Sequence, residues 1–165
     1  MRLTAIPLMM LGFCVCAEQA MKAEKFLGPS TVAILKNATK VEVYRIGGKE
    51  ESRHGKIVGE HIMYRGKDQD KDFAARIAKL LLDDRTYDFE RKKECKPQPG
   101  VAFKIFSEDT SVTLALCFEC DEFDLVTSRK TLHEDFDGNR KEFVKLAQEA
   151  FPDDEVIKAL KAGKE

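Results

Sequence analysis

The sequence lacks an excess of charge of either sign. Of its 165 residues, 28 are lysine or arginine and 29 are aspartate or glutamate, so the formal net charge is −1. Domains that bind nucleic acid usually carry a basic excess or a basic stripe, and glutamates interrupt the cationic stretch at residues 40–53. We therefore expect no nucleic-acid partner.

A second absence is a hydrophobic run long enough to cross a membrane. The apolar segment at residues 3–15 has 13 residues, whereas a transmembrane helix needs about 20. Arg2 before this run and the small Ala17 after it are typical of a secretory signal peptide. The pattern predicts a signal peptide over residues 1–17, cleavage before Glu18, and export to the periplasm or the extracellular space. The mature chain is expected to have no transmembrane helix.

Cys14 and Cys16 raise the alternative of a lipid anchor. Bacterial lipoprotein signals place a small residue directly before the lipidated cysteine, but Phe13 precedes Cys14 and Val15 precedes Cys16. We therefore favour export without a lipid, and lipidation at Cys14 or Cys16 stays the alternative.

The chain also lacks the sequence signatures of common enzymes. It has no glycine-rich phosphate-binding loop and no nucleophile elbow, and its three histidines, His133 among them, stand apart in the sequence. The acidic set Asp121, Glu122 and Asp124 is typical of a solvated loop. We therefore predict no catalytic residues and no bound cofactor, and we favour a non-enzymatic protein.

Hydrophobic periodicity predicts a single α+β domain over residues 30–165, after a flexible lead-in over residues 18–29. Alternating apolar and polar residues predict strands at 40–46, 56–64, 101–106 and 111–118, with a further extended piece at 122–126. A helical period predicts helices at 70–84 and 139–151, and a last short helix is expected to end at Leu160. The apolar cluster at 31–38 fits either a short helix capped by Ser30 or a strand, and we favour the helix. The order β-β-α-β-β-α after the lead-in predicts an antiparallel sheet of about four to five strands, with two main helices packed on one face.

Beyond the expected signal peptide the chain has three cysteines, two of them in the segment CFEC at residues 117–120. In the hairpin 101–118, Cys117 is expected opposite Gly100 and Cys120 opposite Pro97, so Cys95 falls at the same end. Three residues of extended strand span about 10 Å, but a disulfide needs Cα atoms within about 7 Å. Cys117 and Cys120 are therefore not expected to bond to each other. We predict a disulfide from Cys95 to either Cys117 or Cys120, and the choice between them stays open.

Two alternatives use the same cysteines. The first is a zinc-type metal site on Cys95, Cys117 and Cys120, although strong zinc signals carry two CxxC pairs or a CxxC with paired histidines. The second is a thiol-redox enzyme. A redox CxxC of the thioredoxin type lies at a helix N-terminus, which lowers a thiol pKa, whereas acidic and extended residues follow Cys120. The metal site is therefore the stronger alternative.

The segment from Cys95 to Cys120 resembles a family of small exported bacterial proteins of uncharacterised function. The likeness lies in the Cys-Lys-Pro element that begins at Cys95, the strand after it, and the Cys-Phe-Glu-Cys element that ends at Cys120. It implies no activity, but it implies that the three cysteines belong together. We therefore expect an exported, non-enzymatic domain that binds a protein or envelope partner or stabilises an envelope structure, with an oligomeric state that the sequence does not indicate.

Overall fold

The structure is a computed structural model that describes residues 21–47, 54–91 and 93–163. Its sheet contains β1 (Lys40–Ile46), β2 (Lys56–Ile57), β3 (Glu60–Arg65), β4 (Val101–Ser107), β5 (Thr110–Cys117), β6 (Glu122–Val126) and β7 (Thr131–Asp135). The helices are α1 (Lys22–Leu27), α2 (Pro29–Lys36), α3 (Lys71–Leu81), α4 (Arg140–Ala150) and α5 (Glu155–Lys158), with single 3-10 turns η1 (Asp84–Thr86) and η2 (Asp137–Asn139). No helix among these residues is long and apolar enough to cross a membrane.

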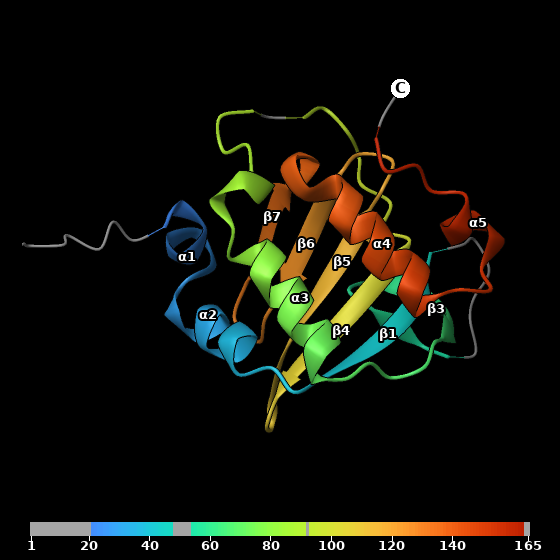
Figure 1. Ribbon diagram of the computed structural model, residues 1–165, viewed down its shortest axis with the longest axis horizontal. Helices are drawn as coiled ribbons and strands as arrows, with labels where there is room; N and C mark the ends of the chain where they lie inside the picture. Colours follow the sequence, from blue (N-terminus) through green and yellow to red (C-terminus); the bar gives the residue numbers. More distant parts are fainter. Residues whose placement is uncertain (1–20, 48–53, 92, 164–165) are drawn as a thin grey trace, which may run out of the picture.

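The sheet has seven strands in the order β2-β3-β1-β4-β5-β6-β7, and every pairing between strands is antiparallel. It curls as it twists, so that its two ends face different directions (Figure 1). The predicted α+β class and antiparallel sheet are confirmed. The expected count of four to five strands is wrong, because the chain also forms β7 and splits one predicted strand in two.

Three helices, α2, α3 and α4, cover one face of the sheet (Figure 1), where the sequence predicted two. The main core lies beneath them, and Phe73, Phe103, Phe123 and Phe143 within it are each at most 1% exposed. Helix α3 has the clearest local origin, because the Asp70 side chain accepts hydrogen bonds from two backbone N–H groups of its first turn. A smaller apolar cluster lies on the opposite face of the sheet.

Residues 56–64, predicted as one strand, form a hairpin instead. Val58 and Gly59 have φ values of 54° and 83°, and two consecutive positive φ values make the tight turn that joins the short strands of a hairpin. The pairing of this segment with β1 is antiparallel, as predicted, with Tyr44 opposite Arg65.

The β4–β5 hairpin has the predicted register. Val101 pairs with Leu116 and Phe106 pairs with Ser111, which places Cys117 beside Gly100, as expected. The lead-in segment contains α1, whose first backbone N–H groups bond to the carboxylate of Asp84 at 3.2 and 2.8 Å. Expectations for residues 1–17, including the signal peptide, Cys14 and Cys16, lie outside the described residues.

Candidate functional site

The candidate site lies at the turn between β5 and β6. The strands end with Cys117 opposite Glu122, and residues 118–121 close the turn, with Asp121 at a φ of 57°. A disulfide joins Cys120 of this turn to Cys95 of the long segment between η1 and β4, with the Cα atoms 6.0 Å apart. This separation lies within the usual range for disulfides, and the bond ties the long segment to the turn.

Polar contacts hold the same turn from two other directions. Arg140 at the start of α4 forms an ion pair with Asp121, and its Nη1 donates to the carbonyl oxygen of Phe118 at 2.8 Å. From the long segment, Lys93 Nζ donates to the carbonyl oxygens of Cys120 at 3.0 Å and Asp121 at 3.2 Å. Two cationic side chains therefore donate hydrogen bonds to the turn's carbonyl oxygens, and Arg140 also balances the charge of its buried carboxylate.

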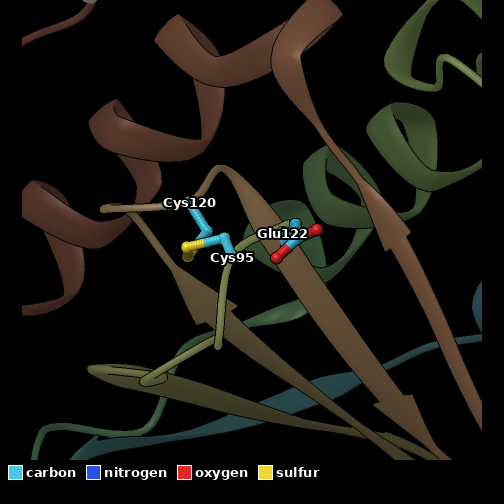
Figure 2. Close-up of side chains that lie close together, drawn as sticks. All are labelled: Cys95, Cys120 and Glu122. Carbon is cyan, nitrogen blue, oxygen red and sulfur yellow. A yellow bond between two sulfur atoms is a disulfide. The ribbon is translucent and has the colours of Figure 1, made fainter. Parts of the chain in front are cut away.

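Cys95, Cys120 and Glu122 form one group, which we call the sulfur–carboxylate cluster. Figure 2 shows the carboxylate of Glu122 beside the disulfide, and the two sulfur atoms and a carboxylate oxygen all lie within 4.8 Å of one another. Glu122 is only 5% exposed, and its Oε2 has no hydrogen-bond partner among the described residues. A buried carboxylate oxygen without a partner is unfavourable unless a proton or a cation compensates it.

A second buried carboxylate, Asp135 on β7, lies directly opposite Glu122 in the sheet. Asp135 is 3% exposed; its Oδ1 accepts from the backbone N of Asp88 at 3.0 Å, while Oδ2 has no hydrogen-bond partner among the described residues. Lys93 Nζ is 3.9 Å from Oδ2 but only 2.8 Å from Asp137. Burial raises the pKa of Asp135 above its ordinary value, because the charged form has lost water without gaining equal compensation.

Both carboxylates line a cavity of about 330 Å³, which we call the carboxylate pocket. Its wall consists of Phe89, Arg91 and Lys93 from the long segment, Glu122 from β6, and His133, Glu134 and Asp135 from β7. Burial also raises the pKa of Glu134. The pocket is therefore a small cavity in which acidic groups on two strands face basic and aromatic residues on one loop.

His133 connects the pocket to the sulfur–carboxylate cluster. Its Nδ1 lies 2.9 Å from Asp124 Oδ1 and its Nε2 lies 3.6 Å from Glu122 Oε1. Burial opposes the charged imidazolium, but the bond to Asp124 and the charges of both carboxylates outweigh it and raise the pKa of His133. The imidazole is therefore poised to carry a positive charge beside two acids.

The structure brings two of the three predicted cysteines together and leaves the third out. Cys117 is a free thiol, 1% exposed, and its Sγ accepts from the backbone N of Gln98 at 3.3 Å. It is not part of the sulfur–carboxylate cluster, whose third member is Glu122. The expectation of a solvated acidic loop is wrong for Asp121 and Glu122, because both are buried. Asp121 is 1% exposed and pairs with Arg140 of α4, and Glu122 is 5% exposed and lines the carboxylate pocket.

The alternation of residues along the strands could have indicated that Glu122 and Asp124 share one face of the sheet. Phe123 and Leu125 point into the main core, so the alternation of a strand places Glu122 and Asp124 together on the other face. The same argument groups His133 with Asp135 on β7. What the sequence did not show was that β6 and β7 pair, which sets His133 opposite Asp124.

Comparison of the chain with models of protein families, with curated proteins and with solved structures gave no match. The resemblance of the cysteine segment to small exported bacterial proteins therefore stays a prediction.

Proposed function

We propose that this protein is an exported, non-enzymatic binding domain, and that the carboxylate pocket takes up a protonated amine or guanidinium group of its ligand or envelope partner. Export rests on the signal-like segment at residues 1–17. The choice of ligand class rests on the two buried carboxylates of the pocket.

The observation that carries the proposal is a pair of buried carboxylate oxygens without a hydrogen-bond partner among the described residues, Glu122 Oε2 and Asp135 Oδ2. Removing a charge from water without full compensation costs several kcal/mol, so a ligand cation near both oxygens gains a closer interaction than the protein supplies. Lys93 fills this role only in part, because its ammonium group is 3.9 Å from Asp135 Oδ2 and lies closer to Asp137 and to two carbonyl oxygens of the turn.

Phe89 in the wall of the pocket fits the same ligand class. Phe89 is 37% exposed, and an aromatic ring beside a cation site favours amines and guanidinium groups. A volume of about 330 Å³ lies at the small end of known ligand sites, and it matches one side chain rather than a large cofactor. We therefore favour a lysine-like or arginine-like group, free or on a peptide.

The three cysteines support a structural role rather than a catalytic one. Cys95 and Cys120 are joined to each other, and Cys117 is buried under the long segment. A reactive thiol is partly exposed and lies among positive charges, which is not the environment of Cys117.

The test is isothermal titration of the oxidised protein with the blocked amino acids N-acetyl-lysine amide and N-acetyl-arginine amide. Nε-acetyl-lysine, also blocked, is the uncharged control. We expect binding of the charged probes, no binding of the control, and a loss of about tenfold or more in affinity in Glu122→Gln and in Asp135→Asn. Glu155→Gln, a change at an exposed carboxylate of α5, is the matched variant and should bind as the wild type does. Equal binding by Glu122→Gln and the wild type, or no binding of either charged probe, would refute the proposal.

A second candidate function, metal binding, is favoured by the sulfur–carboxylate cluster. Its donor set is Cys95, Cys120 and Glu122 rather than the three cysteines expected from the sequence. Because two of these donors are joined in a disulfide, metal binding requires that the bond be reduced.

A further inference from the structure

We infer that the sulfur–carboxylate cluster is a redox-controlled metal site, in which the Cys95–Cys120 disulfide and a bound zinc-type cation are two alternative states of the same residues. In the oxidised state the sulfur atoms bond to each other. In the reduced state two thiolates and the Glu122 carboxylate bind the cation. This inference is independent of the proposed cation pocket, which is defined for the oxidised protein.

The spacing of the three ligand atoms fits a tetrahedral cation. Zinc binds sulfur at about 2.3 Å and carboxylate oxygen at about 2.0–2.2 Å, so ligand atoms around it lie about 3.5–3.8 Å apart. The two sulfur atoms and the Glu122 oxygen already lie within 4.8 Å of one another, and Figure 2 shows all three groups at one end of the sheet. Rotation of side chains is enough to form the site, with a water molecule as the fourth ligand.

Glu122 supplies the observation that distinguishes this group from an ordinary disulfide. The residue is 5% exposed. Its Oε2 atom is buried and has no hydrogen-bond partner among residues 21–47, 54–91 and 93–163. A cation at the cluster binds one oxygen of this buried carboxylate and compensates its charge. Two thiolates and one carboxylate are also a donor set that zinc prefers.

The long segment stays in place when the disulfide is absent, because other contacts hold it on both sides of Cys95. Before Cys95, Asp88 N donates to Asp135 and Lys93 Nζ donates to two carbonyl oxygens of the turn. After Cys95, Gln98 N donates to Cys117 Sγ. The reduced thiols of Cys95 and Cys120 therefore remain neighbours, and no large movement precedes metal binding.

The chemistry of the switch uses a dithiol as the reductant. Cys95 is exposed while Cys120 is buried, so a thiolate of the dithiol attacks the Cys95 sulfur, and the electron pair of the disulfide leaves on Cys120. The second thiol of the reductant then resolves the mixed disulfide, which releases Cys95 and forms a disulfide in the reductant. The two thiols of the protein give up two protons to solvent when the cation binds.

The experiment titrates the exported, mature protein with Co²⁺ and then Zn²⁺, before and after reduction with a phosphine that carries no thiol. In the reduced protein we expect one equivalent of Co²⁺, a thiolate-to-cobalt absorption band, and displacement of cobalt by one equivalent of zinc. The oxidised protein should show no such band at the same concentrations.

Three variants define the ligands. Glu122→Gln should weaken Co²⁺ binding by about tenfold or more, and Cys95→Ser should abolish the thiolate band of a two-sulfur site. Cys117→Ser is the matched cysteine control; its hydroxyl oxygen can still accept from the backbone N of Gln98, so it should bind as the wild type does. Asp135→Asn removes the charge of a pocket carboxylate that is not part of the cluster, and its remaining side-chain oxygen can still accept from the backbone N of Asp88. It should therefore also bind cobalt normally, and this separates failure of the metal site from failure of the proposed function.

Several results would overturn the inference. One is a reduced protein that keeps its circular dichroism spectrum but binds no cobalt. Another is a reduced protein that loses its native spectrum and is not restored by zinc, because the cluster must persist without the disulfide. Binding that depends on Cys117 instead of Cys95 would contradict the assignment of the ligands.

Discussion

Removing the Cys95–Cys120 disulfide should destabilise the protein by about 3.5 kcal/mol at 25 °C. The bond closes a loop of 25 residues, and the chain-entropy relation for a cross-link of that span gives this value, because the open unfolded chain gains conformational freedom. Cys95→Ser is the suitable variant, since Cys95 is exposed and Cys120 keeps its buried sulfur. The loss is a large share of the about 5–15 kcal/mol that typically separates folded from unfolded states.

The assay is urea unfolding followed by circular dichroism, with a chelator and a phosphine reductant present in one arm of the experiment. Reduced wild type and Cys95→Ser should agree, because both lack the cross-link, and both should show a larger dependence of the free energy on urea. Peptide mapping of the oxidised protein should recover Cys95 joined to Cys120, and Cys117 should react with an alkylating reagent only after unfolding. A loss below about 1 kcal/mol contradicts the entropy argument. A loss far above the calculated value means that the contacts of Lys93 and Gln98 do not hold the long segment by themselves.

Three further predictions concern single side chains. Asp70→Ala removes the N-cap of α3 and should lower the free energy of unfolding by about 1 kcal/mol; an unchanged urea midpoint would show that the cap contributes nothing. Arg140→Met leaves the buried Asp121 carboxylate without its cation and should cost about 3–5 kcal/mol, and adding Asp121→Asn should restore part of that loss in a double-mutant cycle. Because the folded pKa of His133 is raised, its contribution to stability is complete below its unfolded pKa of about 6.5 and is lost as pH rises through the folded pKa. His133→Asn should flatten the dependence of unfolding free energy on pH in that window by less than about 1 kcal/mol, since the side chain is half exposed, and an unaltered pH profile would contradict the raised pKa.

The parts of the fold that the sequence predicted well are those with strong local patterns. Strand β1 runs over the predicted residues, and the β4–β5 hairpin has the predicted register, because the length of a short turn fixes which residues of its two strands are paired. Helix α3 was predicted for a similar reason, since its apolar residues recur on one face.

Strand β7 was not predicted because it lies at the edge of the sheet, where few of its side chains have to be apolar. Leu132 packs against the main core, while the residues on either side of it are polar. Its place in the sheet comes from pairing with β6, a contact that local periodicity does not contain. The α1 helix was missed for a related reason, because its start is set by Asp84, more than sixty residues along the chain.

The candidate site depends on such distant contacts more than any other part of the molecule. Glu122 has the sequence pattern of a surface residue, but it is 5% exposed and lies beside Phe89 and Lys93 of the long segment in the carboxylate pocket. The choice of Cys120 over Cys117 as the partner of Cys95 has the same origin. The turn carries Cys120 out of the regular strand toward the long segment, whereas Cys117 stays within β5 and contacts Gln98.

The contacts around the β5–β6 turn divide into two kinds with different physical roles. The disulfide acts mainly on the unfolded chain, where it removes conformational freedom. The Arg140–Asp121 ion pair and the bonds from Lys93 act on the folded state, where they fix the positions of the turn and of Glu122 beside it. Because the second set does not depend on the sulfur atoms, we expect reduction of the disulfide to lower stability while the turn and Glu122 keep their positions. The proposed redox-controlled metal site requires this separation, because the two thiolates must remain neighbours after the disulfide is broken.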